Sequence, residues 1–135
     1  MQRFTAGSFL LAIALFIACC GVCEAAEDMR FVDAEDDTGY YVDAASIARV
    51  SDTEFDAVVA VIKAAENRLY LYHTRFNHQA GTYRIFDARV EVYDTKEILR
   101  TMQGMDTPQV YTPASPMRGI VDFIEELLAE KQQTA

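Results

Sequence analysis

Hydrophobic and polar residues alternate along most of the chain between residues 29 and 105. Such alternation is typical of β-strands that place one face in a core and the other toward water. Polar clusters at 66–68 and 77–82 separate the alternating segments and indicate short connections. We therefore predict an antiparallel β-meander of about five to six strands. The candidate strands are residues 29–32, 39–43, 55–65, 69–76, 83–94 and 98–105.

The candidate strand with the sequence FDAVVAVIKAA is the most apolar segment after residue 26. Val58, Ala60 and Ile62 fall on one of its faces, and Val59 and Val61 fall on the other. Because both faces are apolar, this pattern predicts a central strand that is buried on two sides.

The two candidate strands that follow differ in how regular their alternation is. In LYLYHTRF, one face carries Tyr70, Tyr72, Thr74 and Phe76, and the other carries Leu71, His73 and Arg75. In YRIFDARVEVYD, the apolar positions from Phe86 onward are out of phase with Tyr83 and Ile85. A β-bulge near Ile85 or Phe86 would reconcile the two phases, because it inserts one extra residue into a strand.

The period changes in the closing segment SPMRGIVDFIEELLAEK, which predicts an α-helix. Ser115 is a favourable N-cap, and Pro116 suits the first helical position. Gly119 disfavours the helix by about 1 kcal/mol relative to alanine, so packing must hold it. One apolar stripe is formed by Met117, Ile120, Val121, Ile124, Leu127 and Leu128. We expect this stripe to cover one face of the sheet, which gives an α+β fold.

The first 25 residues predict a secretory signal peptide rather than part of the folded domain. Arg3 provides a short basic start, and the apolar run from Phe9 to Cys20 is 12 residues long. Cys23 and Ala25 are small residues in the positions that favour cleavage before Ala26. We therefore expect a leader at 1–25 and a single domain at 26–135, whose length suits one core.

A lipoprotein is the alternative to ordinary cleavage. The segment FIAC, which ends at Cys19, loosely resembles a lipobox, although its leading phenylalanine fits poorly. Acylation of Cys19 would tether the domain to a membrane. Ordinary cleavage is the preferred interpretation, with no membrane span in the mature chain.

Composition narrows the classes of partner. All three cysteines, Cys19, Cys20 and Cys23, lie in the leader, so the mature domain relies on its core without disulfides. From Ala26 onward, 20 acidic and 11 basic side chains leave a net charge of −9. This charge argues against nucleic acid and against an anionic membrane surface as partners.

Residue types that carry catalysis or bind metals do not form a convergent set. His73 lies within a strand and His78 in a turn, and zinc would need further ligands. The acidic run Asp33, Glu35, Asp36 and Asp37 does not fit the calcium-binding loop of an EF-hand, and we interpret it as an exposed connection. We predict no catalytic residues, no metal and no cofactor. An enzyme would need a deep polar pocket around Asp87, His73 or Glu91.

Three segments together resemble one known family. They are GYYVDAASIARV, TYRIFDARVEVYD and TPASPMRGIVDFI, in this order, with an apolar strand between the first two. Over residues 29–126 the chain is similar to the small bacterial domain called surface-adhesin protein E. The resemblance implies an antiparallel sheet packed by a C-terminal helix, and an adhesin for host matrix or serum proteins. The family's disulfide is missing, because 77–78 and 122–123 contain no cysteine.

These observations predict an exported, non-enzymatic binding module, located in the periplasm, on the cell surface or outside the cell. The expected partner is a protein, either a host extracellular protein or a component of the envelope. The alternative function is a structural or accessory cell-envelope protein with a bacterial partner. The candidate contact residues are Arg68, Tyr70, Tyr72 and Arg75, the tyrosines and arginines of the central hairpin. Their simpler interpretation is as ordinary residues of a half-buried sheet.

Mass spectrometry of the exported protein tests the leader. We expect a mature chain that starts at Ala26, because the small residues before it fit the cleavage site. An acylated Cys19 at the N-terminus would contradict this expectation and would identify a lipoprotein.

Overall fold

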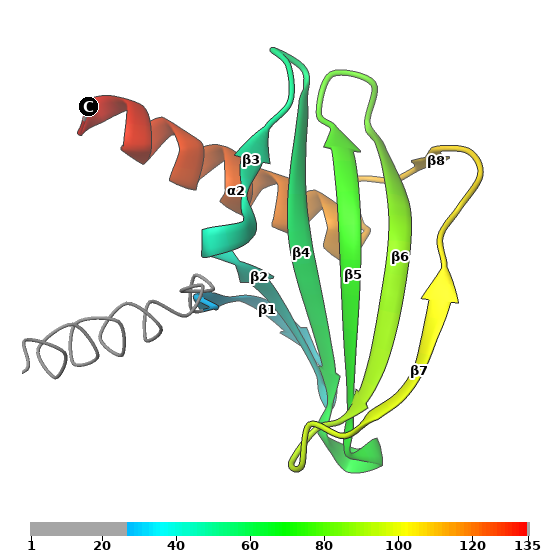
Figure 1. Cartoon of the computed structure of the whole chain (residues 1–135). Coiled ribbons are helices and arrows are strands. Elements are labelled where there is room, and N and C mark those ends of the chain that lie inside the picture. The colour runs from blue at the N-terminus through cyan, green and yellow to red at the C-terminus, as the bar shows by residue number, and fades with distance from the viewer. Residues whose placement is uncertain (1–26, 135) are drawn as a thin grey trace, which may run out of the picture.

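The computed structural model describes residues 27–134, so the predicted leader and Cys19 lie outside the described residues. Within this range the chain forms one antiparallel sheet and one C-terminal α-helix (Figure 1), which confirms the predicted α+β class. The strands are β1 Met29–Glu35, β2 Thr38–Asp43, β3 Ala48–Arg49, β4 Glu54–Lys63, β5 Arg68–Asn77, β6 Thr82–Val92, β7 Ile98–Gln103 and β8 Gln109–Val110. The helix is α2 Pro116–Gln133, and two short 3-10 helices are η1 Ala44–Ser46 and η2 Ala64–Glu66.

The strands follow the predicted meander, in the order β1-β2-β4-β5-β6-β7. The sheet described by residues 27–134 nevertheless has eight strands, so the predicted five to six was too low. The reason is that two places in the sheet, beside β4 and beside β6, are each occupied by two separate strands. β2 and β3 both pair with β4 and are separated by η1, while β7 and β8 both pair with β6. The alternation of apolar and polar residues along the sequence does not reveal that two short strands share one neighbour.

The turn between β1 and β2 contains the acidic residues. Asp33 and Glu35 belong to β1, and Asp36 and Asp37 form the two-residue turn. Asp36 adopts the left-handed conformation, with a φ of 54°. Aspartate tolerates this conformation better than most residues, because its short polar side chain can hydrogen-bond locally. The acidic run therefore builds a hairpin, and all four carboxylates are exposed.

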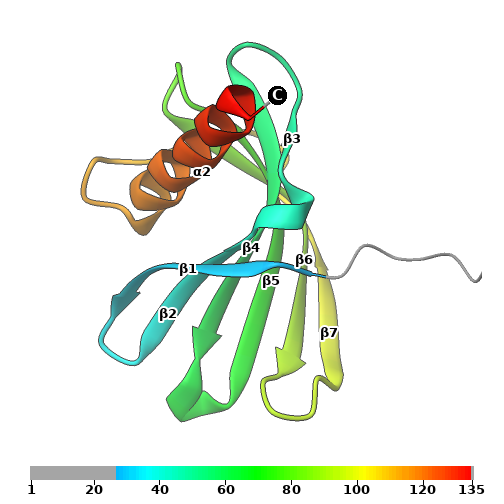
Figure 2. The ribbon, with the colours of Figure 1, turned by 90° about the vertical axis from the view of Figure 1, so that its left-hand side faces the viewer.

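The apolar stripe of α2 forms the main core with the sheet. Ser115 caps the helix, because its Oγ accepts a hydrogen bond from the backbone N–H of Met117 at 3.2 Å. Figure 2 shows α2 lying across one side of the sheet. Its buried residues Ile120, Val121 and Ile124 belong to one cluster with Val42, Phe55, Ala57, Val59 and Phe76. We call this side of β4 and β5, which carries Val59 and Phe76, the helix face.

The opposite side, which we call the open face, carries a second apolar cluster. Ala60, Leu69 and Leu71 are buried there, and Tyr41 packs against them. At the centre of β4, Val59 is 0% exposed on the helix face and Ala60 is 1% exposed on the open face. The prediction that β4 is a central strand buried on two sides is therefore confirmed.

The predicted bulge in β6 is also confirmed. Thr74 pairs with Ile85 and His73 pairs with Asp87, which leaves Phe86 as the extra residue. Because of the bulge, Tyr83 and Ile85 lie on the same face of the sheet as Ala88 and Val90. Phe86 lies close to side chains of the open face, and its ring is 5.3 Å from that of His73.

Gly104 and Gly119 offer a matched test of this architecture. A Cβ at Gly104 would lie 1.9 Å from the carbonyl oxygen of Ile85, so Gly104→Ala must displace the backbone beside the bulge. We expect a loss of about 1–3 kcal/mol in the free energy of unfolding. A Cβ at Gly119 meets nothing within 4 Å, so Gly119→Ala should raise that free energy by about 0.5–1 kcal/mol.

Urea unfolding of the two variants measures both effects. Each variant adds one methyl group, so the comparison separates backbone crowding from helix propensity. A neutral Gly104→Ala, or a destabilising Gly119→Ala, would contradict the packing described above.

Candidate functional site

The four predicted contact residues all lie on β5, but the structure does not bring them together on one surface. Arg68, Tyr70 and Tyr72 alternate in phase with Phe76 and therefore belong to the helix face. Arg75 lies one position out of phase and belongs to the open face. The candidate site is therefore divided by the pleat of the strand.

The rings of Tyr70 and Tyr72 stack beside the helix-packed core. Their centroids are 6.4 Å apart, with an angle of 6° between the ring planes. Tyr72 packs against the core cluster, and both tyrosines are half-buried. Each ring thus has part of its area against protein and part toward solvent.

Three cations lie on the same face of the sheet as these rings. The Nζ of Lys63 lies 5.8 Å from the centroid of Tyr70, and Lys63 pairs with Arg68 in the ladder between β4 and β5. Arg100 on β7 pairs with Val90, which in turn pairs with Tyr70, so it faces the same side. We call the five residues Lys63, Arg68, Tyr70, Tyr72 and Arg100 the tyrosine patch. Such a basic surface contrasts with the net charge of −9 for the whole chain.

Lys63 and Arg100 were not predicted as contact residues. Both come from other strands, and their position beside the tyrosines depends on the register of β4 with β5 and of β6 with β7. Alternation within one segment carries no information about that register. A sequence signal for Lys63 exists only in hindsight, because it continues the phase of Val59 and Val61.

The phenol of Tyr72 is shifted toward its neutral form. Burial raises the pKa of Tyr72, the neighbouring Tyr70 raises it further, and the positive charge of Arg100 opposes both effects. The phenol therefore keeps its proton, and with it a hydrogen-bond donor, over a wider pH range than a solvated tyrosine.

Arg75 takes part in a separate cluster on the open face. Its Nε and Nη2 donate to the two carboxylate oxygens of Asp56 at 2.7 Å and 3.0 Å. Its guanidinium carbon also lies 5.1 Å from the ring centroid of Phe86. The hydrogen bond to Asp56 raises the pKa of Arg75. These contacts tie Arg75 to β4 and to the bulge of β6.

The two histidines lie in different surroundings. His73 Nδ1 is 3.3 Å from a carboxylate oxygen of Asp87, and the side chains are 46% and 69% exposed. Both residues line a recess of about 390 Å³ on the open face. His78 contacts Glu125 of α2 at 3.2 Å through Nδ1, and its ring stacks on Phe55. Among residues 27–134 there is no group of three or more His, Cys, Asp or Glu side chains that could hold a metal ion.

Comparison of the chain with protein-family models, with curated proteins and with solved structures finds no match. The resemblance to surface-adhesin protein E therefore stays a prediction that rests on three sequence segments. None of the helices in the described part of the chain is long and apolar enough to cross a membrane.

Alkaline pH tests the environment of Tyr72. Because its folded pKa is raised above the ordinary value of 10.0, the folded protein keeps a proton that the unfolded chain loses. This stabilisation is fully present below the ordinary pKa and is lost as the pH rises through the folded pKa. Tyr72→Phe should therefore reduce the loss of stability between neutral pH and about pH 11, as measured by urea unfolding. An unchanged pH dependence in this variant would contradict the burial of the phenol.

Proposed function

We propose that this protein is an exported, non-enzymatic binding module that recognises a protein partner through the tyrosine patch. The observation that carries the proposal is the stacked pair Tyr70 and Tyr72, bordered by three cations from three strands. Tyrosine and arginine dominate the residues on which protein–protein affinity depends, because they combine large apolar area with hydrogen-bond donors.

The composition of the patch selects the chemistry of the partner. Lys63, Arg68 and Arg100 provide three positive charges around two aromatic rings. A surface with acidic side chains beside an apolar residue would complement this arrangement. Like-charged surfaces are disfavoured, so the acidic remainder of the protein directs an acidic partner to the patch.

The rigidity of the patch also supports binding. The register of β4 with β5 is continuous over ten residue pairs, from Glu54 with Asn77 to Lys63 with Arg68. Nη1 of Arg68 donates to the backbone carbonyl of Asn67 at 3.1 Å, which restricts the guanidinium. Contact residues held in this way lose less conformational entropy when a partner binds.

Two classes of protein partner are accessible to an exported module. A host matrix or serum protein is favoured by the resemblance to surface-adhesin protein E. A bacterial envelope protein is the second candidate, in which case the module has a structural or accessory role. The same patch serves either partner, so its variants test both.

Substitutions in the patch test the proposal. The protein, exported with its own leader and purified, is passed over immobilised laminin and fibronectin and, separately, over solubilised envelope proteins in a surface plasmon resonance assay. Tyr70→Ala and Arg100→Glu should each weaken the binding about tenfold or more, because each removes or reverses an anchor. Arg49→Glu is the matched control, since Arg49 is an exposed arginine on β3 outside the patch.

The outcomes separate the alternatives. Patch-dependent binding to matrix proteins supports the adhesin, and patch-dependent recovery of one envelope protein supports the accessory role. Equal binding by the wild type, both patch variants and Arg49→Glu would show that the patch is not the site. Thermal unfolding of each variant checks that the fold is retained.

A further inference from the structure

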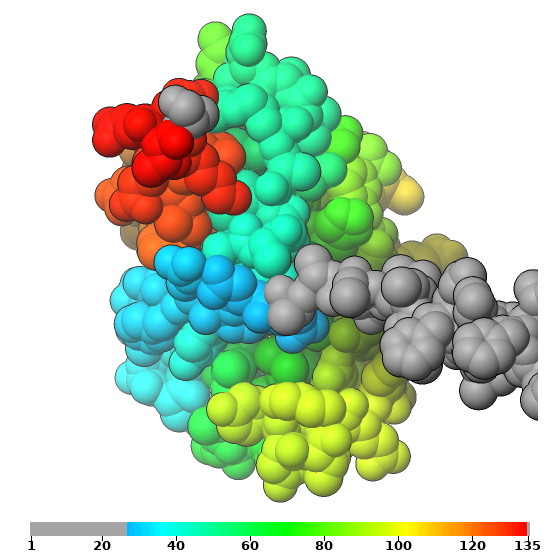
Figure 3. All heavy atoms as spheres, turned by 60° about the vertical axis from the view of Figure 1, so that its left-hand side comes forward, coloured from blue at the N-terminus to red at the C-terminus, as the bar shows by residue number. Residues whose placement is uncertain are grey.

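A pocket of about 510 Å³ lies on the open face. Figure 3 shows it as a recess between the blue start of β1 and the yellow connection between β6 and β7, with green atoms of the central strands behind. Its volume is within the range of small-ligand sites. Because the tyrosine patch is on the helix face, this pocket is independent of the site proposed above.

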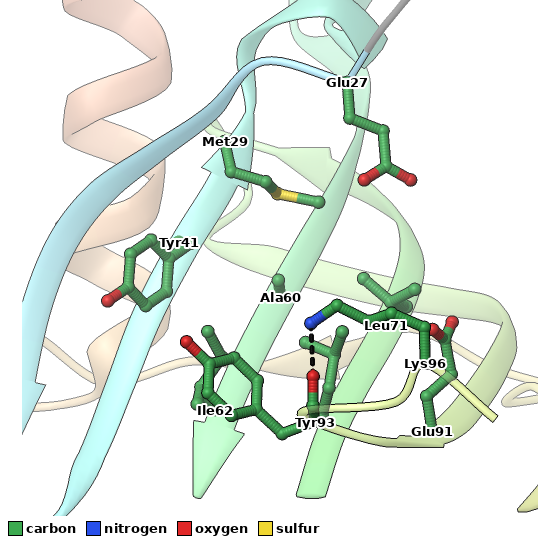
Figure 4. A pocket seen from close by; sticks show the side chains of 10 residues that line it. Glu27, Met29, Tyr41, Ala60, Ile62, Leu71, Glu91, Tyr93 and Lys96 are labelled. Carbon is green, nitrogen blue, oxygen red and sulfur yellow. Dashed lines mark hydrogen bonds between the residues drawn. The ribbon is translucent and has the colours of Figure 1, made fainter. Parts of the chain in front are cut away.

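The floor of the pocket is apolar. It is built by Ala60 and Ile62 of β4 and by Leu69 and Leu71 of β5. Met29 and Tyr41 form the wall on the side of the β1–β2 hairpin, as Figure 4 shows. A ligand that enters would exclude water from these side chains, which favours an apolar body.

Lys96 places an ammonium group at this apolar floor. Figure 4 shows its side chain reaching from the β6–β7 connection toward the centre of the pocket. Nζ donates to the backbone carbonyl of Tyr93 and lies 4.3 Å from the centroid of the Tyr93 ring. An ammonium group has three donors, so two remain for a ligand.

The backbone at Lys96 is in a conformation that lysine rarely adopts. Its φ is 64°, and the other left-handed residues among residues 27–134 are Asp36, Asn67 and Gly81. Those three residue types tolerate the left-handed region, whereas a long side chain such as lysine has no local reason to occupy it. Glycine would suit this turn better, so Lys96 is the exception that a role for its side chain would explain.

The acidic side chains around the pocket do not cancel this role. Glu91 is 5% exposed, and its Oε2 accepts a hydrogen bond from Nε of Arg89 at 2.8 Å, which offsets its charge. Glu27 lies on the β1 side, above the floor, while Lys96 enters from the β6–β7 side (Figure 4). Lys96 is therefore the cation that faces the apolar floor.

We propose that this pocket binds a small amphipathic carboxylate, such as a medium-chain fatty acid. The carboxylate accepts hydrogen bonds from the free donors of Lys96, and the hydrocarbon chain covers Ala60, Ile62 and Leu71. A charge-assisted contact at the edge of an apolar floor fixes the orientation of such a ligand.

Three probes of equal chain length test the assignment by isothermal titration calorimetry. These are decanoate and decylamine, each below its critical micelle concentration, and decanol below its solubility limit. We expect decanoate to bind most tightly, decanol more weakly and decylamine weakest. Tighter binding of decylamine would assign the pocket to cations held by Glu27 and Glu91, and would overturn the proposal. Absence of binding by all three probes would also overturn it.

Two variants identify the residues involved. Lys96→Gly should weaken decanoate binding about tenfold, since a hydrogen bond to a charged group is lost, and should leave decanol binding unchanged. The same variant should keep or raise the thermal midpoint, because glycine adopts the left-handed conformation without strain. Ala60→Val should weaken the binding of both decanoate and decanol, because the larger side chain takes up volume at the floor of the pocket.

Decanoate binding by Lys96→Gly separates a binding role of Lys96 from a purely structural one. If the lysine served only to hold its own turn, Lys96→Gly would leave decanoate binding unchanged, which would contradict the proposal. Arg84→Gln is the control for a general loss of positive charge on the open face, because Arg84 donates to the carbonyl of Met105 outside the pocket. This control should bind decanoate as the wild type does.

Discussion

The contact between Ile120 and Ile124 of α2 and the aromatic side chains Phe55 and Phe76 of the sheet holds the domain together. All four side chains are at most 1% exposed. Burial of each large apolar side chain contributes about 1.5–3 kcal/mol, which is a large share of the stability of a small domain. No cysteine follows Cys23 in the sequence, so covalent cross-links do not share this task. The helix must therefore remain docked for the sheet to keep its helix face dry.

The docking of the helix also determines which surfaces stay available. α2 covers the part of the helix face around Phe55, Val59 and Phe76, and the tyrosine patch lies farther along the same strands, toward η2. The open face has no helix among the described residues, and there the β1–β2 hairpin and the β6–β7 connection border the pocket. Both candidate sites share the β4–β5 hairpin, since neighbouring residues such as Tyr70 and Leu71 point to opposite faces.

Interruptions of the strands shape both sites. The bulge at Phe86 inserts one extra residue into β6, and Gly104 approaches the backbone there so closely that a side chain has no room. On the edge of β4 away from β5, η1 separates β2 from β3. There Oγ of Ser46 accepts a hydrogen bond from the backbone N–H of Val58 at 2.8 Å. Beside the bulge, the backbone N–H of Met105 donates to the carbonyl oxygen of Ile85 at 2.7 Å. At both interruptions a hydrogen bond from outside the regular ladder therefore pairs a backbone group of the sheet.

Local patterns were sufficient to predict the helix with its Ser115 cap, the two-sided burial of β4 and the bulge of β6, because caps, periods and phase breaks act over a few residues. The same patterns could not show that β2 and β3 share one neighbour, or that Lys63 and Arg100 lie beside Tyr70 while Arg75 lies on the other face of the sheet from them. These features depend on the register between strands that are distant in the chain. Register is set when whole faces are buried together, so it belongs to the folded molecule rather than to any one segment.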